Sequence, residues 1–91
     1  MFTLKEIELF VVDNLTYTDI WQVGDTLEVI FNRENGQSLA LIKVVDGIAK
    51  VTELYRSREL SSPISKRRRF KSFKRLQSFL ELLNTSCIGK E

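Results

Sequence analysis

The hydrophobic positions near the start of the chain recur at helical spacing. They are Leu4, Ile7, Phe10, Val11 and Leu15. A spacing of three to four residues places such side chains on one stripe of an α-helix. Just before the stripe, Thr3 and Glu6 have the spacing of a capping box, in which each side chain accepts a hydrogen bond from the other residue's backbone amide. The pattern predicts a helix over residues 3–13, although β-branched side chains over residues 7–12 leave a strand as the alternative.

In the centre of the chain, over residues 26–56, apolar positions alternate with polar ones, which is typical of half-buried strands. Strands are predicted over residues 26–32, 37–45 and 48–56. Asn35-Gly36 and Asp46-Gly47 separate them, and both dipeptides suit the two-residue type I′ turn that joins hairpin strands. The three strands are therefore predicted to form an antiparallel meander. Residues 14–25, which lack such alternation, are interpreted as a connection.

The two turns also imply a register, because a two-residue turn determines which residues face each other across a hairpin. In the first hairpin the implied pairs are Phe31 with Ala40, Val29 with Ile42, Leu27 with Val44 and Glu28 with Lys43. In the second hairpin they are Val44 with Ala49 and Ile42 with Val51. The apolar pairs all lie on one face of the meander, and the charged pair lies on the opposite face. One face of the meander is therefore expected to be buried.

The opposite face of the meander is also partly apolar. It carries Ile30, Leu39, Leu41 and Leu54 around the charged residues Glu28, Lys43 and Lys50. One interpretation is that a helix or the 14–25 connection covers part of this face. The other is that the four apolar residues form a candidate interface for a second copy or another partner, since contiguous exposed apolar area usually marks an interaction surface.

Residues 57–71 include the only proline and are predicted as a basic loop or edge strand. Helical spacing returns after them, with Ser72 as a candidate N-cap. The second apolar stripe consists of Phe73, Leu76, Phe79, Leu80 and Leu83. It predicts a helix over residues 72–84, followed by a tail at residues 85–91.

These elements predict a single α+β domain over residues 1–91, a three-stranded antiparallel β-meander flanked by an N-terminal and a C-terminal helix. A chain of this length buries only about 60–65% of the surface that it exposes when unfolded. The C-terminal helix is therefore expected to belong to the core, packed on the face that holds Val29, Ile42 and Val51.

Charge is unevenly distributed along the chain, although the net charge is only +2. Residues 1–46 hold three basic and eight acidic side chains, whereas residues 47–91 hold eleven basic and four acidic ones. Seven cations lie within ten residues and are called here the basic strip: Lys66, Arg67, Arg68, Arg69, Lys71, Lys74 and Arg75. The last three flank the predicted helix start, where free amides and the helix dipole favour a bound anion such as phosphate.

Candidate catalytic chemistry is scarce. The chain has no histidine, and Cys87 is a single thiol near the end of the chain. Asp13, Asp19 and Asp25 recur every six residues, which does not match the alternating ligands of a Ca²⁺ loop. No catalytic residue, metal or cofactor is therefore predicted. No stretch approaches the roughly 18–20 apolar residues of a membrane span, and a cytoplasmic protein without membrane contact is expected.

The predicted element order, with cations at the start of the last helix, resembles the layout of the double-stranded-RNA-binding domain. In that family a lysine-rich segment at this position contacts backbone phosphates, so the resemblance implies this role for residues 66–75. The resemblance is one of layout alone. The connection at residues 57–71 is longer, and the Asn35-Gly36 loop shorter, than the family has.

The sequence thus predicts a small non-catalytic binding protein that contacts nucleic-acid phosphates through the basic strip. An alternative is a protein-interaction module, such as an inhibitor or accessory protein of a phage or mobile element. It would bind an acidic partner, or form a homodimer through the second sheet face. A third interpretation is that the strip is only a solvated surface.

Overall fold

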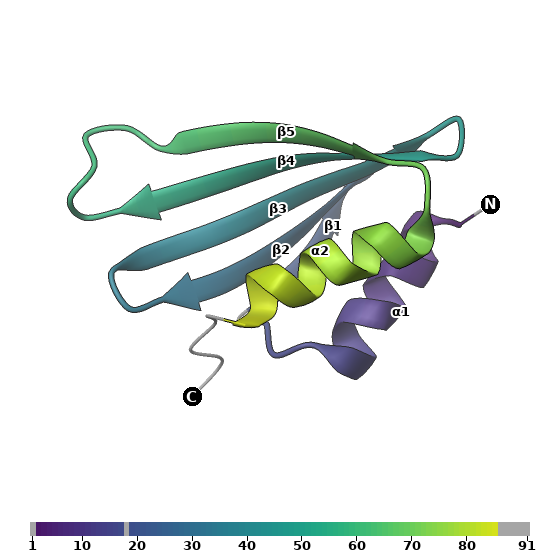
Figure 1. The fold of residues 1–91 in the computed structure, drawn as a ribbon, viewed down its shortest axis with the longest axis horizontal. Coiled ribbons are helices and arrows are strands. Elements are labelled where there is room, and N and C mark those ends of the chain that lie inside the picture. The colour runs from purple at the N-terminus through teal and green to yellow at the C-terminus, as the bar shows by residue number, and fades with distance from the viewer. Residues whose placement is uncertain (1, 18, 86–91) are drawn as a thin grey trace.

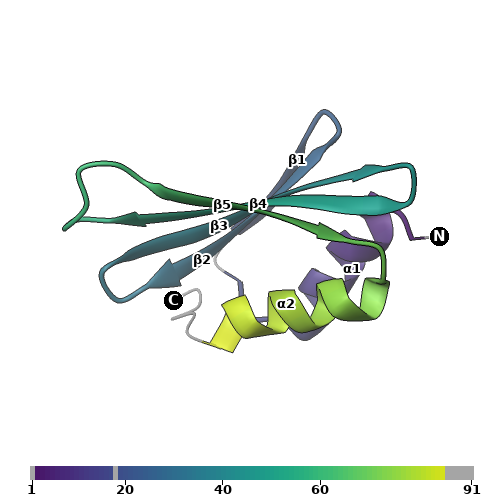
Figure 2. The same ribbon diagram turned by 45° about the horizontal axis from the view of Figure 1, so that its top comes forward.

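Five antiparallel strands form one sheet, and both helices lie on the same face of it (Figure 1, Figure 2). The structure, a computed structural model, describes residues 2–17 and 19–85. The elements in chain order are α1 (Leu4–Asn14), β1 (Asp19–Val23), β2 (Thr26–Arg33), β3 (Gly36–Val45), β4 (Ile48–Ser57), β5 (Ile64–Phe70) and α2 (Phe73–Thr85). The strands follow one another across the sheet as a meander. The α+β class is confirmed, but the sheet has five strands where the sequence predicted three.

The start of α1 is set by the capping box that the sequence predicted. The Thr3 hydroxyl accepts a hydrogen bond from the Glu6 amide at 3.2 Å, and the Thr3 amide donates to the Glu6 carboxylate at 3.1 Å. Two backbone donors that a helix start leaves unpaired are thereby satisfied. The N-terminal segment is therefore a helix, and the alternative of a strand over residues 7–12 is wrong.

The second helix begins after Ser72, whose hydroxyl accepts a hydrogen bond from the Arg75 amide at 3.4 Å. It runs one residue further than predicted, because Thr85 is its last residue and not the first residue of a tail. The Thr85 hydroxyl donates to the Glu81 carbonyl oxygen at 3.0 Å. The remainder of the predicted tail, residues 86–91 with Cys87, lies outside the described residues.

The core lies between the helices and one face of the sheet. The fully buried side chains from the sheet and from the helices are Leu27, Val29, Phe31, Ala40, Ile42, Ala49, Ile7, Val11, Leu76 and Leu80. The predicted packing of the C-terminal helix on the face of Val29, Ile42 and Val51 is confirmed. Phe73 joins the two helices, since its ring stacks on Phe2 at 5.5 Å between centroids and meets the Phe10 ring edge-on at 6.2 Å.

Strand β1 lies in the segment that was interpreted as a connection, so that prediction is wrong. It pairs with β2 from Asp19 opposite Ile30 to Val23 opposite Thr26, through a turn in which Gly24 has φ +62°. The strand was missed because apolar and polar residues alternate only weakly along it. Ile20 packs against the core, but the large apolar residues Trp21 and Val23 are exposed on the other face. Apolar side chains on both faces of an edge strand conceal the period of two.

The predicted register of the first hairpin is wrong by two residues. Phe31 pairs with Ser38, Val29 with Ala40 and Leu27 with Ile42, and the turn consists of Glu34 and Asn35. Glu28 therefore faces Leu41 and not Lys43, and Lys43 instead forms an ion pair with Asp25 at 3.8 Å. Because the shift is even, every side chain keeps its predicted face.

The physical reason for this register lies in Gly36. It is the first residue of β3, where it faces Ser57 of β4, and a Cβ atom at this position would overlap the Arg56 carbonyl oxygen. The glycine thus serves close backbone approach between strands rather than a turn with positive φ. The second hairpin is as predicted: Asp46 and Gly47 have φ 52° and 74°, and Val44 faces Ala49.

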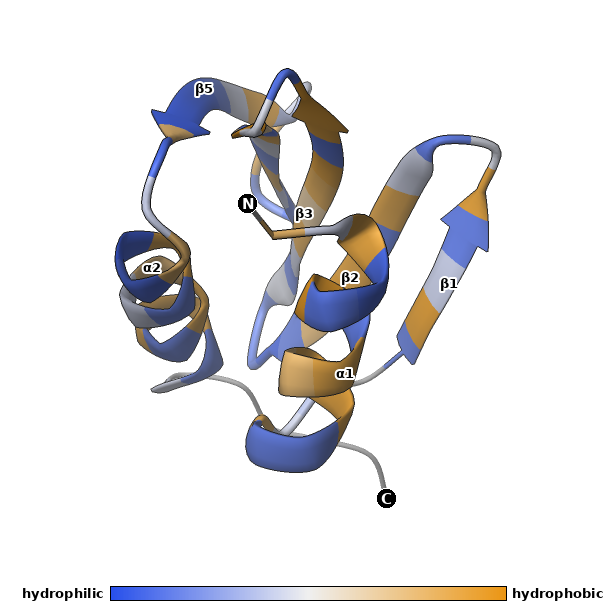
Figure 3. Ribbon diagram, turned by 90° about the vertical axis from the view of Figure 1, so that its right-hand side faces the viewer, coloured by the Kyte–Doolittle hydropathy of each residue, from blue (hydrophilic) through white to orange (hydrophobic). Residues whose placement is uncertain are grey.

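Strand β5 occupies residues 64–70 of the segment predicted as a basic loop or edge strand. It pairs with β4 from Tyr55 opposite Ile64 to Ala49 opposite Phe70, and it forms one edge of the sheet. Just before its last residue, Phe70, the strand is hydrophilic, as the colour of its arrowhead shows (Figure 3). Four cations of the basic strip therefore have strand geometry, and a charged edge of this kind discourages pairing between sheets of different molecules.

Candidate functional site

The basic strip is divided between two faces of the sheet. Side chains alternate along a strand, so Arg67 and Arg69 of β5 lie on the face without helices, called here the open face. Lys66 and Arg68 lie on the helix-bearing face, opposite Glu53 and Val51 of β4. The four cations of β5 are all exposed, but they do not form one surface.

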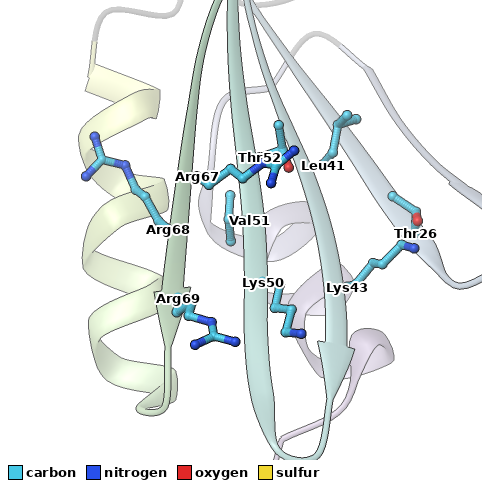
Figure 4. Close-up of a pocket in the computed structure, with 9 residues that line it drawn as sticks. All are labelled: Thr26, Leu41, Lys43, Lys50, Val51, Thr52, Arg67, Arg68 and Arg69. Atoms are coloured by element: carbon cyan, nitrogen blue, oxygen red, sulfur yellow. The ribbon is translucent and has the colours of Figure 1, made fainter.

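The open face adds two cations that lie far from the strip in sequence. Lys43 of β3 faces Lys50 of β4, and Lys50 faces Arg69 of β5, so three cations form a row across three neighbouring strands. Arg67 lies two residues along β5 from Arg69, in a second row with Thr52 and Leu41 (Figure 4). The sequence already predicted that Lys43 adjoins Lys50. Their proximity to β5 depends on the pairing of β5 with β4, whereas the sequence predicted residues 57–71 only as a basic loop or edge strand, without a pairing partner.

These residues surround a groove on the open face, of about 720 Å³. It is called here the basic groove, and its lining residues are Thr26, Leu41, Lys43, Lys50, Val51, Thr52, Arg67, Arg68 and Arg69. Among these lining residues there is no carboxylate. The acidic partner of Lys43 is Asp25, which forms the 3.8 Å ion pair with it and has an 80% exposed side chain. An ion pair this exposed is worth at most about 1 kcal/mol and leaves Lys43 available to other anions.

Arg68 has a different environment from its neighbours, although it also borders the groove. Its guanidinium forms an ion pair with Glu53 at 3.3 Å and lies 4.9 Å from the centre of the Phe79 ring of α2. Figure 4 shows it directed away from Arg67 and Arg69. Arg68 thus links β5 to β4 and to α2, through charge and through a cation–π contact. Its surroundings indicate a structural role.

The other three cations of the strip lie where β5 passes into α2. Lys71, Lys74 and Arg75 are exposed around the first turn of α2, as the sequence predicted. The helix dipole places positive charge at this end as well. Lys71 directly follows Phe70, the last residue of β5, and Lys74 and Arg75 belong to the first turn of α2.

The four apolar residues of the candidate interface all lie on the open face. Ile30, Leu39 and Leu54 are neighbours on β2, β3 and β4, and Leu41 also lines the basic groove. Neither helix covers them, and β1 extends the sheet at its edge rather than crossing this face (Figure 2). Leu39 is nevertheless buried, with 7% exposure, and the other three are half-buried.

Trp21 is the open-face residue that the sequence interpretation missed. It is 41% exposed, on β1 at the edge opposite β5. The available signal was the chain's single tryptophan in a segment otherwise rich in polar residues. Its position could not be inferred while residues 14–25 were interpreted as a connection.

Other classes of site find little support among the described residues. Within residues 2–17 and 19–85, no three histidine, cysteine, aspartate or glutamate side chains gather closely enough to hold a metal ion. In the same ranges neither helix is both long and apolar enough to cross a membrane.

The resemblance to the double-stranded-RNA-binding layout does not extend to this structure, because four strip residues lie in β5 and two further strands are present. Comparison with known proteins found no matching protein-family model, no matching curated protein and no matching solved structure. The chemistry of the open face is therefore the available indication of function.

Proposed function

We propose that this protein is a non-catalytic binding module that contacts nucleic-acid phosphates through the basic groove. The observation that carries the proposal is the gathering of four cations from three adjacent strands, Lys43, Lys50, Arg67 and Arg69, with no carboxylate among the lining residues. Phosphates are the complementary ligand, because arginine donates paired hydrogen bonds to them and lysine contributes a point charge.

The electrostatics of the groove favour an anionic partner. Like charges that face each other across a sheet destabilise it by roughly 0.2–1 kcal/mol, and Lys43 and Lys50 are such a pair. A bound phosphate between them would convert that repulsion into attraction. Lys71, Lys74 and Arg75 lie beyond the end of β5 and would attract further phosphates of the same chain.

A phosphate contact of this kind is sensitive to salt. Each neutralised phosphate releases counterions, and the logarithm of affinity falls with the logarithm of salt by about 0.7–0.9 per contact. Four contacts would lower the affinity by about 50- to 150-fold between about 50 mM and 200 mM salt. The affinity of a contact that involves no charged groups would change little over that range of salt concentration.

The test is a titration of a fluorescently labelled oligonucleotide at several salt concentrations. The double variant Arg67→Gln/Arg69→Gln is expected to bind at least about tenfold more weakly at low salt and to show a salt slope reduced by about 1.4–1.8. Lys5→Gln/Arg58→Gln is the matched control, since it removes the same net charge outside the groove. Absence of binding by the unaltered protein at low salt, or an equal loss in the control, would overturn the proposal.

A second candidate function is binding of an acidic protein surface. Its support is the apolar set beside the groove, since Ile30, Leu41 and Leu54 are only half-buried on a face without helices. A homodimer through this face fits less well, because it would bring the cations of both copies together. Affinity capture with and without nuclease separates the two functions: a discrete partner protein that survives nuclease treatment favours this one.

A further inference from the structure

We infer that the nucleic acid bound in the basic groove is single-stranded, and that Trp21 stacks on one of its bases. This inference rests on the proposed function, because it takes the groove as the contact for the phosphates. It adds a second contact, at the opposite edge of the open face, and it names the class of ligand.

Trp21 is presented to solvent on the same face as the groove. Ile20, its neighbour on β1, packs against the core on the helix-bearing face, so the alternation of the strand places Trp21 on the open face. An exposure of 41% is large for a tryptophan, whose ring is usually well buried. None of the ring pairs found among the described residues includes Trp21.

Trp21 and the groove lie on one line across the sheet. The cross-strand pairs run from Trp21 on β1 to Glu28, Leu41, Thr52 and finally Arg67 on β5. Four strand spacings of about 4.8 Å separate the ends of this line, or roughly 19 Å. A nucleic-acid strand that crosses the β-strands at right angles would therefore meet the cations over β3–β5 and the indole over β1.

The charge along this line divides it into two parts. Glu28 lies between Trp21 and Leu41, and Asp25 lies in the adjoining turn, so this end repels phosphate. A base suits that end instead: the indole can stack on its face, and a carboxylate can accept hydrogen bonds from exocyclic amino groups. The phosphates then belong to the end with Lys43, Lys50, Arg67 and Arg69.

A duplex uses this surface less well than a single strand does. Its bases are already stacked on one another, so an indole on a sheet surface reaches a base face only after unstacking it. The sheet, at roughly 19 Å across, is also wider than a major groove of about 12 Å and would rest on the outer backbone. A single strand has free base faces, and stacking on an aromatic side chain is available to every base.

The experiment uses the intrinsic fluorescence of Trp21, which is the only tryptophan of the chain. The probes are oligodeoxycytidylate of about 12 nucleotides, whose bases carry an exocyclic amino group, and a mixed-sequence duplex of the same length. At low salt the single strand is expected to quench the fluorescence and to bind at least about tenfold more tightly than the duplex.

Substitution separates stacking from phosphate contact. Trp21→Ala is expected to lower affinity for the single strand by about 5- to 100-fold and to leave duplex affinity unchanged, whereas Trp21→Phe retains most of the binding. These two variants lack the tryptophan signal, so their affinities are measured with fluorescently labelled oligonucleotides. Val23→Ala is the matched control, because Val23 is an exposed apolar residue on the same strand and face. Circular dichroism verifies that each variant is folded.

The outcomes distinguish this inference from the proposed function. If both probes bind equally with a steep salt dependence and Trp21→Ala binds as the unaltered protein does, the single-strand inference fails and the phosphate proposal stands. If neither probe binds at low salt, both fail. Single-strand preference together with loss on Trp21→Ala supports both.

Discussion

The two faces of the sheet are built from the same five strands but differ in what covers them and in what they carry. The helix-bearing face holds residues such as Val29, Ile42 and Val51, which are buried beneath α1 and α2. The open face holds Lys43, Lys50 and cations of β5, with no helix over it (Figure 2). Stability is thus concentrated on one face, and the other is free to carry charge that a core would not tolerate.

The contrast is clearest within a run of three identical residues. All three border the groove, but Arg67 and Arg69 lie on the open face, whereas Arg68, between them, contacts Glu53 and the Phe79 ring on the helix-bearing face. Adjacent residues of one chemistry therefore have different surroundings, because a strand directs successive side chains to opposite faces. Substitutions that separate the faces test this division.

The largest expected effect is on the helix-bearing face. Leu80→Glu places a charge among fully buried residues of α2 and should leave the protein largely unfolded, since burying an unpaired charge consumes much of a stability of about 5–15 kcal/mol. Leu82→Glu on the same helix is the control: its side chain is 70% exposed, and a change within about 0.5 kcal/mol is expected. Thermal unfolding followed by circular dichroism measures both. Equal loss in the two variants would contradict the packing of α2.

An intermediate effect is expected at Gly36, which tests the register that places the open-face residues. Gly36→Asn should lower the free energy of unfolding by about 2 kcal/mol or more, because its Cβ would overlap the Arg56 carbonyl oxygen. Gly24→Asn is the comparison, since asparagine tolerates positive φ and no atom of the described residues lies within 4 Å of a Cβ there. Urea denaturation of both variants measures the change in the free energy of unfolding. If Gly36→Asn left the free energy of unfolding unchanged, a type I′ turn at Asn35-Gly36 would be favoured over the observed register.

The smallest effects separate the adjacent arginines. Arg68→Gln should reduce stability by about 1 kcal/mol, through loss of the Glu53 and Phe79 contacts, and change oligonucleotide affinity little. Arg67→Gln should have the opposite effects. It should leave stability unchanged and make the salt dependence of oligonucleotide affinity shallower, by about one in the slope. Denaturant titration and binding titration of both proteins give the comparison. If Arg68→Gln weakened binding as much as Arg67→Gln does, the strip would act as one surface.

The candidate site could be predicted only in part. The basic strip was evident in the sequence, and Lys66, Lys71, Lys74 and Arg75 are exposed, as expected of contact residues. The division of the basic strip between the two faces of the sheet was not evident, because residues 57–71 could be interpreted as a loop or as a strand. Lys43 and Lys50 could be paired with each other through the Asp46-Gly47 turn, but nothing local connected them to β5.

What the sequence determined by itself is local: both helices with their Thr3 and Ser72 caps, the alternation of the central strands, and the Asp46-Gly47 turn. Each depends on interactions between residues a few positions apart, which periodicity and capping reveal. Tertiary structure decided that residues 19–23 join the sheet, that Gly36 faces β4, and that Arg67 and Arg69 meet Lys43 and Lys50. Those features arise from pairing between strands, where the partner and not the segment itself selects the neighbours of each side chain.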